Sequence, residues 1–272
     1  MTGTKVLYVS QEITPYLPET EMSMIGRNLP QAIQEKGREI RTFMPKFGCI
    51  NERRNQLHEV IRLSGMNIII DDTDHPLIIK VASIQAARMQ VYFIDNDDYF
   101  QRKFLFSDDK GVYFEDNDER AIFFARGVLE TVKKLQWPPS IIHCHGWFSA
   151  LLSLYIKRLS DDDPVFKNAK VILSLYDNEF GQPLNKAFRK KLRMDGVPEA
   201  DLKVVEDPSY INYCKMVVNM SDGIVIGSKQ IHKDVLKYIE KSDKPLLPYQ
   251  NSDTYVEAYS AFYDQVLNGS GT

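Results

Sequence analysis

The sequence lacks the features that mark several large classes of protein. No run approaches the roughly 18 uninterrupted apolar residues of a membrane-spanning helix. Lysine and arginine number 34 against 37 acidic residues, a formal net charge of −3, and no stretch is rich in basic residues. This balance excludes binding to nucleic acid by bulk charge. With 43% apolar and 26% charged residues, the chain is also neither disordered nor collagen-like. We expect a globular protein with no nucleic-acid or membrane partner.

Cysteine is scarce, and the common glycine-rich motifs are absent. The three cysteines are Cys49, Cys144 and Cys214, which are widely spaced and form no Cys-x-x-Cys pair. Together with an N-terminus that does not resemble a signal peptide, they favour reduced thiols in a cytoplasmic protein. No G-x-G-x-x-G, Walker A or G-x-S-x-G motif occurs, which excludes the usual phosphate-binding loops and the nucleophile elbow. We expect no cofactor.

Short apolar runs alternate with helical patterns along the chain. A buried strand at 6–10, a helix at 22–36 and a strand at 40–44 make one βαβ unit with parallel strands. Further strands are predicted at 141–145, 171–175 and 223–226, and further helices at 116–135, 147–158, 211–220 and 254–267. The alternation predicts an α/β fold, a single Rossmann-like and doubly wound sheet that is mainly parallel. Residues 68–84 are predicted to be an inserted β-hairpin.

A histidine pair closes one of the predicted strands. His143 and His145 point to the same face of that strand, and open α/β sheets bind ligands at the carboxyl ends of their strands. His145 and Trp147 are therefore candidates to line a crevice, although a hydrogen-bonded His143 and a core Trp147 are the alternative. A metal site would need further ligands that the sequence does not show, so we expect none.

Other polar residues near strand ends leave two interpretations open. Asn96 follows the predicted strand at 91–94 and either contacts sugar hydroxyls or makes an Asx turn, which is favoured. Glu12 follows the first strand at a switch-point location, where it is either a ligand contact or a solvated loop residue. Asp116 and Glu119 fit a helix capping box. Residues 186–193, which hold five basic side chains, are better explained as a solvated helix face than as a phosphate site.

Taken together, several segments resemble the bacterial starch/glycogen synthases, from about residue 4 to residue 230. The segments that carry the resemblance are Lys5-Val-Leu-Tyr-Val-Ser-Gln-Glu-Ile-Thr-Pro15, Leu29-Pro-Gln-Ala-Ile33, Val91-Tyr-Phe-Ile-Asp-Asn96 with Tyr99-Phe100, Asp116-Asn-Asp-Glu-Arg-Ala-Ile-Phe-Phe124 and Ile141-Ile-His-Cys-His-Gly-Trp147. The resemblance implies a retaining GT-B glycosyltransferase, which moves glucose from ADP-glucose to an α-1,4-glucan. Tyr99, Phe100 and Trp147 are candidates to stack on sugar rings, although core packing is the default for each.

The chain departs from the family pattern at three places. Where the family has Lys-Thr-Gly-Gly-Leu-Ala-Asp near the donor diphosphate, this chain has Pro18-Glu-Thr-Glu-Met-Ser-Met24. The family's Ile-His-Asn becomes Leu175-Tyr-Asp177, which puts Tyr176 in place of the histidine near the transferring sugar. Its His-Asp-Trp becomes His145-Gly-Trp147. Since a lysine is lost and carboxylates are gained, the first loop is expected to repel a diphosphate. Tyr176 and Asp177 join the candidates for ligand contact, and no residue is assigned as catalytic.

A GT-B enzyme closes two Rossmann-like domains around its donor. We expect residues 1–272 to form one starch-synthase-like N-terminal domain, with a core at 4–230, a helical tail at 231–272 and no second GT-B domain. Apolar residues at 256, 259, 262 and 266 predict that the last helix packs back on the core. Glucosyl transfer is then expected to be impaired or absent unless a protein partner supplies the second domain. The alternative is a non-catalytic module that binds α-glucan or pairs with a synthase; α-glucan and a nucleotide-sugar are the ligands implied.

Overall fold

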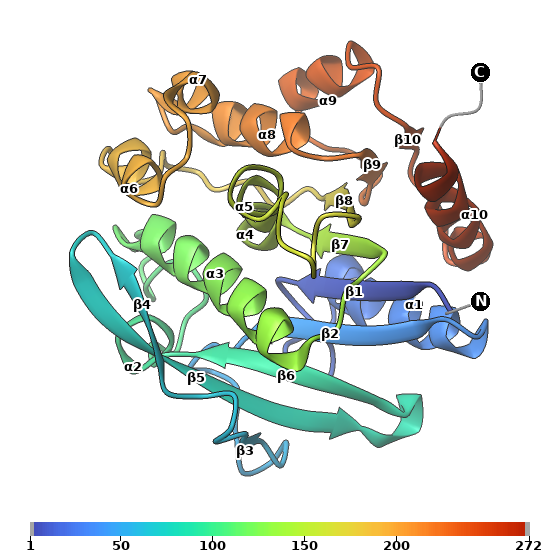
Figure 1. Cartoon of the computed structure of the whole chain (residues 1–272), viewed down its shortest axis with the longest axis horizontal. Helices are drawn as coiled ribbons and strands as arrows, with labels where there is room; N and C mark the ends of the chain where they lie inside the picture. Colours follow the sequence, from blue (N-terminus) through green and yellow to red (C-terminus); the bar gives the residue numbers. More distant parts are fainter. Residues whose placement is uncertain (1–2, 270–272) are drawn as a thin grey trace.

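Consecutive apolar residues form strands that are buried on both faces at the centre of the molecule (Figure 1). The structure is a computed structural model that describes residues 3–269. Its strands are β1 (Lys5–Ser10), β2 (Glu39–Pro45), β3 (His58–Glu59), β4 (Met66–Ile70), β5 (Thr73–Ile84), β6 (Met89–Asp95), β7 (Ile141–His145), β8 (Lys170–Leu175), β9 (Gly223–Ile226) and β10 (Leu246–Leu247).

The helices connect these strands. They are α1 (Glu21–Glu35), α2 (Asp97–Phe100), α3 (Asn117–Leu135), α4 (Trp147–Ala150), α5 (Leu152–Leu159), α6 (Phe188–Met194), α7 (Glu199–Leu202), α8 (Tyr210–Asn219), α9 (Lys233–Glu240) and α10 (Tyr255–Asn268), with 3-10 turns at Gln85–Ala87 and Lys203–Val205. Among the described residues, no helix is both long enough and apolar enough to span a bilayer.

The sheet is mainly parallel, as the sequence predicts. Its strand order is β10-β9-β8-β7-β1-β2-β6-β5-β3, with β4 paired to β5 alone. β1 lies parallel to both β2 and β7, and β7, β8 and β9 continue in the same direction. The predicted βαβ unit and the α/β doubly wound fold are confirmed. Because these strands run in one direction, their carboxyl ends share one edge of the sheet.

The predicted hairpin is also confirmed, as an antiparallel extension beside the parallel strands. β4 pairs with β5, and β5 pairs with β6, both in antiparallel register. Asp71 and Asp72 form the turn between β4 and β5 with φ of 44° and 65°. This left-handed conformation is tolerated by Asp and suits a two-residue hairpin turn.

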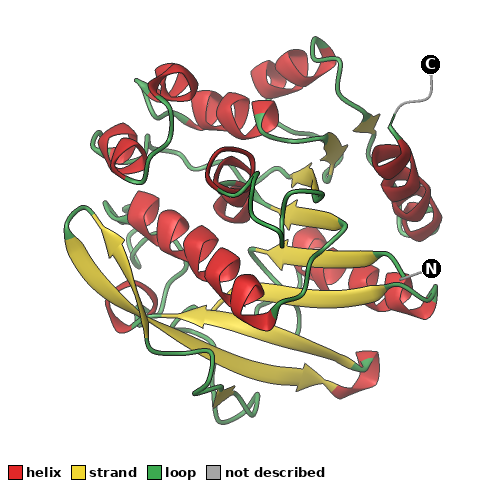
Figure 2. Cartoon of the chain, viewed as in Figure 1, coloured by secondary structure: helices red, strands yellow, loops and turns green. Residues whose placement is uncertain are grey.

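Helices cover both faces of the sheet (Figure 2). On one face α3, α5 and α8 enclose the larger apolar core, and on the other α1 and α10 cover a smaller cluster that includes Val6, Tyr8 and Val225. From α10, Tyr259, Phe262, Tyr263 and Val266 are buried in this cluster. The prediction that the last helix packs back on the core is therefore confirmed.

The predicted capping box is wrong, and the predicted solvated helix face holds only in part, because tertiary partners compete for the side chains. The capping box at the start of α3 does not form: the Asp116 carboxylate pairs with Arg102, and Glu119 pairs with the Lys191 Nζ at 2.6 Å. Lys191 also pairs with the fully buried Asp118 at 2.8 Å. The basic segment is therefore not wholly a solvated helix face, since its Lys191 belongs to a buried ion cluster.

Candidate functional site

A cleft of about 640 Å³ opens at the carboxyl edge of the sheet. Segments that directly follow β1, β8 and β9 form it, together with the start of α1 and the connection between β10 and α10. Its lining residues are Glu12, Thr20, Glu21, Met22, Tyr176, Asp177, Asn178, Ser228, Lys229, Gln230 and Tyr249. The cleft thus lies where open α/β sheets generally bind ligands.

The N-terminus of α1 faces this cleft with the Thr20 and Ser23 N–H groups already paired. The Thr20 hydroxyl accepts from the Ser23 N–H at 3.0 Å, and the Ser23 hydroxyl accepts from the Thr20 N–H at 2.8 Å, which completes a capping box. Thr20 also donates to the Glu12 carboxylate at 2.8 Å. A helix N-terminus can bind an anion, but here the Glu12 carboxylate already lies beside the N-cap residue.

The lining of the cleft carries more negative than positive charge. Glu12, Glu21 and Asp177 contribute three carboxylates, and among the described lining residues Lys229 is the one cation. None of these carboxylates forms an ion pair within residues 3–269. In the same part of the chain, no group of three His, Cys, Asp or Glu side chains is arranged to hold a metal ion. The cleft therefore favours neutral or cationic ligands over anionic ones.

Tyr176 forms part of the cleft wall and separates His145 from it. The Tyr176 hydroxyl is hydrogen-bonded to Nδ1 of His145 at 2.8 Å, and its ring lies directly on Gly227, where an added Cβ would come within 2.7 Å of the ring. Burial raises the pKa of Tyr176 well above its ordinary value, so the hydroxyl stays protonated. His145 is fully buried, and its Nε2 atom has no partner among the described residues.

A buried polar layer continues from His145 toward α10. The rings of His143 and His145 have centroids 4.0 Å apart. His143 is hydrogen-bonded through Nδ1 to the Tyr263 hydroxyl at 2.7 Å and through Nε2 to the Ser174 hydroxyl at 2.8 Å. Burial lowers the pKa of both histidines, that of His145 to about 3. The pair is therefore neutral and serves as a structural link between the sheet and α10.

Met22 packs against Gly146, the residue that follows β7. Gly146 follows β7 with φ of 84°, and a Cβ added there would lie 2.9 Å from the Met22 sulfur. The altered loop at 18–24 thus packs the Met22 side chain onto the residue that follows His145. Met22 and Tyr176 both line the cleft.

Three of the six predicted ligand contacts line the cleft. Glu12, Tyr176 and Asp177 are among the lining residues, and their contact with a ligand stays a prediction. The other three are buried and do not line the cleft in this conformation, and their contact with a ligand likewise stays a prediction. His145 is buried behind Tyr176, and Asn96 is buried because its Oδ1 atom caps α2 through the Asp98 and Tyr99 N–H groups. The favoured Asx-turn interpretation of Asn96 is correct.

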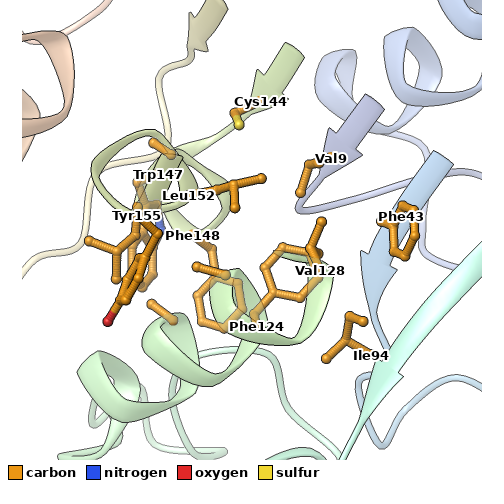
Figure 3. Packing of buried hydrophobic residues seen from close by; sticks show 14 of the residues in the cluster. Val9, Phe43, Ile94, Phe124, Val128, Cys144, Trp147, Phe148, Leu152 and Tyr155 are labelled. Atoms are coloured by element: carbon orange, nitrogen blue, oxygen red, sulfur yellow. The ribbon is translucent and has the colours of Figure 1, made fainter. Parts of the chain in front are cut away.

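Trp147 is the third, and it belongs to the core. Its side chain is 2% exposed and packs against Phe106 and Phe180, with ring centroids 5.0 and 4.9 Å apart. Figure 3 shows it among other buried side chains of α4 and α5, including Phe148 and Leu152. Tyr99 and Phe100 are also buried. None of the three aromatic residues that we considered for sugar stacking is free to stack on a ligand in this conformation.

Several lining residues were not predicted from the sequence. Asn178 and the segment 228–230 directly follow predicted strands, so the strand-end rule that selected His145 would also have found them. Tyr249 carries no such signal, because it enters the cleft only through the return of the chain between β10 and α10.

Comparison with known proteins assigns the chain to a family. Residues 5–244 match the family model described as the starch synthase catalytic domain. The glycogen synthase of Chlorobium limicola is 35% identical over 276 residues, which cover 98% of this chain and 53% of that protein. The glycogen synthase of Pelodictyon phaeoclathratiforme is 38% identical over 273 residues, which cover 97% and 52%. The chain spans about half the length of these curated relatives.

A solved structure supports the fold. The catalytic domain of starch synthase IV from Arabidopsis thaliana, bound to ADP and acarbose, superposes with a TM-score of 0.68 at 17% sequence identity. The match covers 93% of this chain and 52% of that one, and identifies the fold as the GT-B type seen in starch synthases. With the family match over most of its length, the chain belongs to the starch synthase catalytic-domain family.

Proposed function

We propose that the protein is a glycogen/starch-synthase-like protein that binds α-glucan, and that its own cleft does not transfer glucose from ADP-glucose. Membership of the starch synthase catalytic-domain family and the glycogen synthase name of its relatives support the glucan part of the proposal. The cleft at the carboxyl ends of β1, β8 and β9 is the site that we assign to this function.

The charge of the cleft carries the proposal that transfer is impaired. Departure of a nucleoside diphosphate from glucose needs preorganised positive charge, which is typically worth several kcal/mol at such a leaving group. Glu12, Glu21 and Asp177 oppose that charge, and Lys229 is the one cation among the described lining residues. Thr20 and Ser23 already cap the α1 N-terminus. Transfer would require cations from outside this cleft, such as those of a donor domain.

A neutral glucan meets no such opposition. Sugar hydroxyls donate readily to carboxylates, and the amides of Asn178 and Gln230 offer both donors and acceptors. The same carboxylates that repel a diphosphate therefore suit a polyhydroxylated, uncharged ligand. This is the alternative of a non-catalytic glucan-binding module, and the charge of the cleft favours it.

Incorporation of radiolabelled glucose from ADP-glucose into glycogen tests the proposal. We expect the purified protein to incorporate no more label than its heat-denatured control, while an active glycogen synthase assayed in parallel does. In glycogen-containing native gels the same preparation is expected to be retarded. Time-dependent incorporation that Asp177→Asn or Glu21→Gln alters would contradict the catalytic part, and unretarded migration would contradict the glucan part.

A further inference from the structure

A second hollow of about 610 Å³ continues the cleft along α1. The two hollows share Thr20, Glu21, Lys229 and Tyr249. We call the second one the tail groove; its lining residues are Glu19, Thr20, Glu21, Met24, Ile25, Asn28, Lys229, Tyr249, Gln250, Asn251, Ser252 and Tyr255. One wall is the start of α1, and the other is the segment 249–255. That second wall lies beyond residue 244, where the family match ends.

The wall formed by 249–255 is held in place from both sides. Before Tyr249, β10 pairs with β9 in parallel register, and the nearby Glu21 carboxylate raises the pKa of Tyr249. Beyond Tyr255, α10 is fixed to the core by its buried face and by ion pairs of Lys36 with Glu257 at 2.6 Å and of Arg38 with Asp264 at 3.0 Å. The groove is therefore largely pre-formed, as small-molecule sites usually are.

The lining combines apolar surface with planar polar groups. Tyr249 and Tyr255 are partly exposed, and Met24 is 43% exposed. Between them lie the amides of Asn28, Gln250 and Asn251. A sugar ring presents apolar C–H groups on its faces and hydroxyls at its edge, so tyrosine rings and amides match the two parts of its surface.

The charge of the groove restricts the ligand further. Glu19 and Glu21 add their carboxylates to those of Glu12 and Asp177 in the adjoining cleft, against the single cation Lys229 among the described lining residues. A phosphorylated sugar or a nucleotide would be repelled along the whole trough. The lining thus favours a neutral, polyhydroxylated chain.

We propose that the tail groove binds part of a linear α-glucan. One end of the glucan lies in the cleft, and the sugar units that follow stack on Tyr249 and Tyr255 in the tail groove. The inference rests on the proposed glucan-binding function and adds a binding surface that the segment after residue 244 creates. Because the two hollows adjoin at Glu21 and Tyr249, a longer oligosaccharide that enters both gains contacts that a disaccharide lacks.

Calorimetric titration with maltoheptaose and with maltose tests this inference. We expect Tyr255→Ala to weaken maltoheptaose binding roughly 3- to 10-fold, the size of one lost aromatic contact, and to leave maltose binding unchanged. Asn28→Trp, which fills the groove from an exposed position on α1, is expected to weaken maltoheptaose binding without a change in thermal stability. Tyr238→Ala on α9, outside the groove, is the matched control and should bind as the parent does.

The results of these titrations test the tail groove and the proposed function separately. If both Tyr255→Ala and Asn28→Trp bind maltoheptaose as tightly as the parent protein does, the tail groove is not a glucan-binding site. That result would leave the proposed function intact. An absence of maltoheptaose binding by the parent protein would overturn both. Binding of spermidine or ADP that Asn28→Trp abolishes would overturn the assignment to a neutral ligand.

Discussion

Replacement of Arg120 by alanine is expected to destabilise the protein by about 3–5 kcal/mol, the range for breaking a buried polar cluster with a large side chain. The guanidinium of Arg120 is fully buried, and burial lowers the pKa of Arg120 to about 9. It donates to the carbonyls of Tyr99 and Leu105 at 2.8 and 2.7 Å and to the Asn117 side chain at 2.7 Å. Alanine leaves these acceptors unpaired and opens a cavity.

The location of the damage is also predicted. Arg120 holds the loop between α2 and α3 through Tyr99 and Leu105 and stacks near the rings of Phe100 and Phe47, at 5.4 and 5.7 Å. Limited proteolysis of Arg120→Ala should therefore begin in residues 101–116. Urea denaturation measures the loss of stability, with Arg53→Ala as the control because Arg53 is exposed. A denaturation midpoint equal to that of the control would show that the buried guanidinium is not needed.

Mild acid is expected to destabilise the protein through its buried histidine pair. Unfolded histidines take up a proton near pH 6.5, whereas burial keeps the pKa of His143 and His145 far below that value in the folded state. The unfolded state then binds more protons, so this contribution to stability falls as the pH drops below about 6.5. Each histidine contributes up to about 1.4 kcal/mol per pH unit until its folded pKa is reached.

Two measurements distinguish the effect of the histidines on stability from the effect of the carboxylates. Burial raises the pKa of Asp118 to about 6, and this carboxylate stabilises the fold as the pH falls. The double variant His143→Gln/His145→Gln should therefore show a smaller loss of stability between pH 6.5 and 5 than the parent, while His58→Gln, at an exposed position, should match the parent. By NMR, two histidines should not titrate down to pH 5. Titration of all five histidines near pH 6.5 is the result that disagrees.

Sequence patterns predict the architecture well because burial sets them. The apolar run at β1, the helical stripe of α3 and the apolar face of α10 each match the observed burial. The strand-end rule likewise placed Glu12, Tyr176 and Asp177 at the cleft. These predictions require only the spacing of apolar residues along the sequence and the shared direction of parallel strands.

The remaining features depend on partners that are distant in sequence. His145 was predicted to face a crevice, but Tyr176 from the next strand covers it. The capping box at Asp116 fails because Arg102 and Lys191 pair with its two carboxylates. Tyr249 lines the cleft together with Glu21 only because α10 returns to the face that α1 covers. The spacing of apolar residues along the sequence does not predict such contacts.

A crystal soaked with ADP gives the most direct test of the central claim, that the acidic cleft of this chain does not hold a nucleoside diphosphate. Glu12, Glu21 and Asp177 line this cleft, and Thr20 and Ser23 form a capping box at the N-terminus of α1. We predict a cleft free of nucleotide after the soak. An ordered ADP with its diphosphate against residues 18–24 would contradict the account.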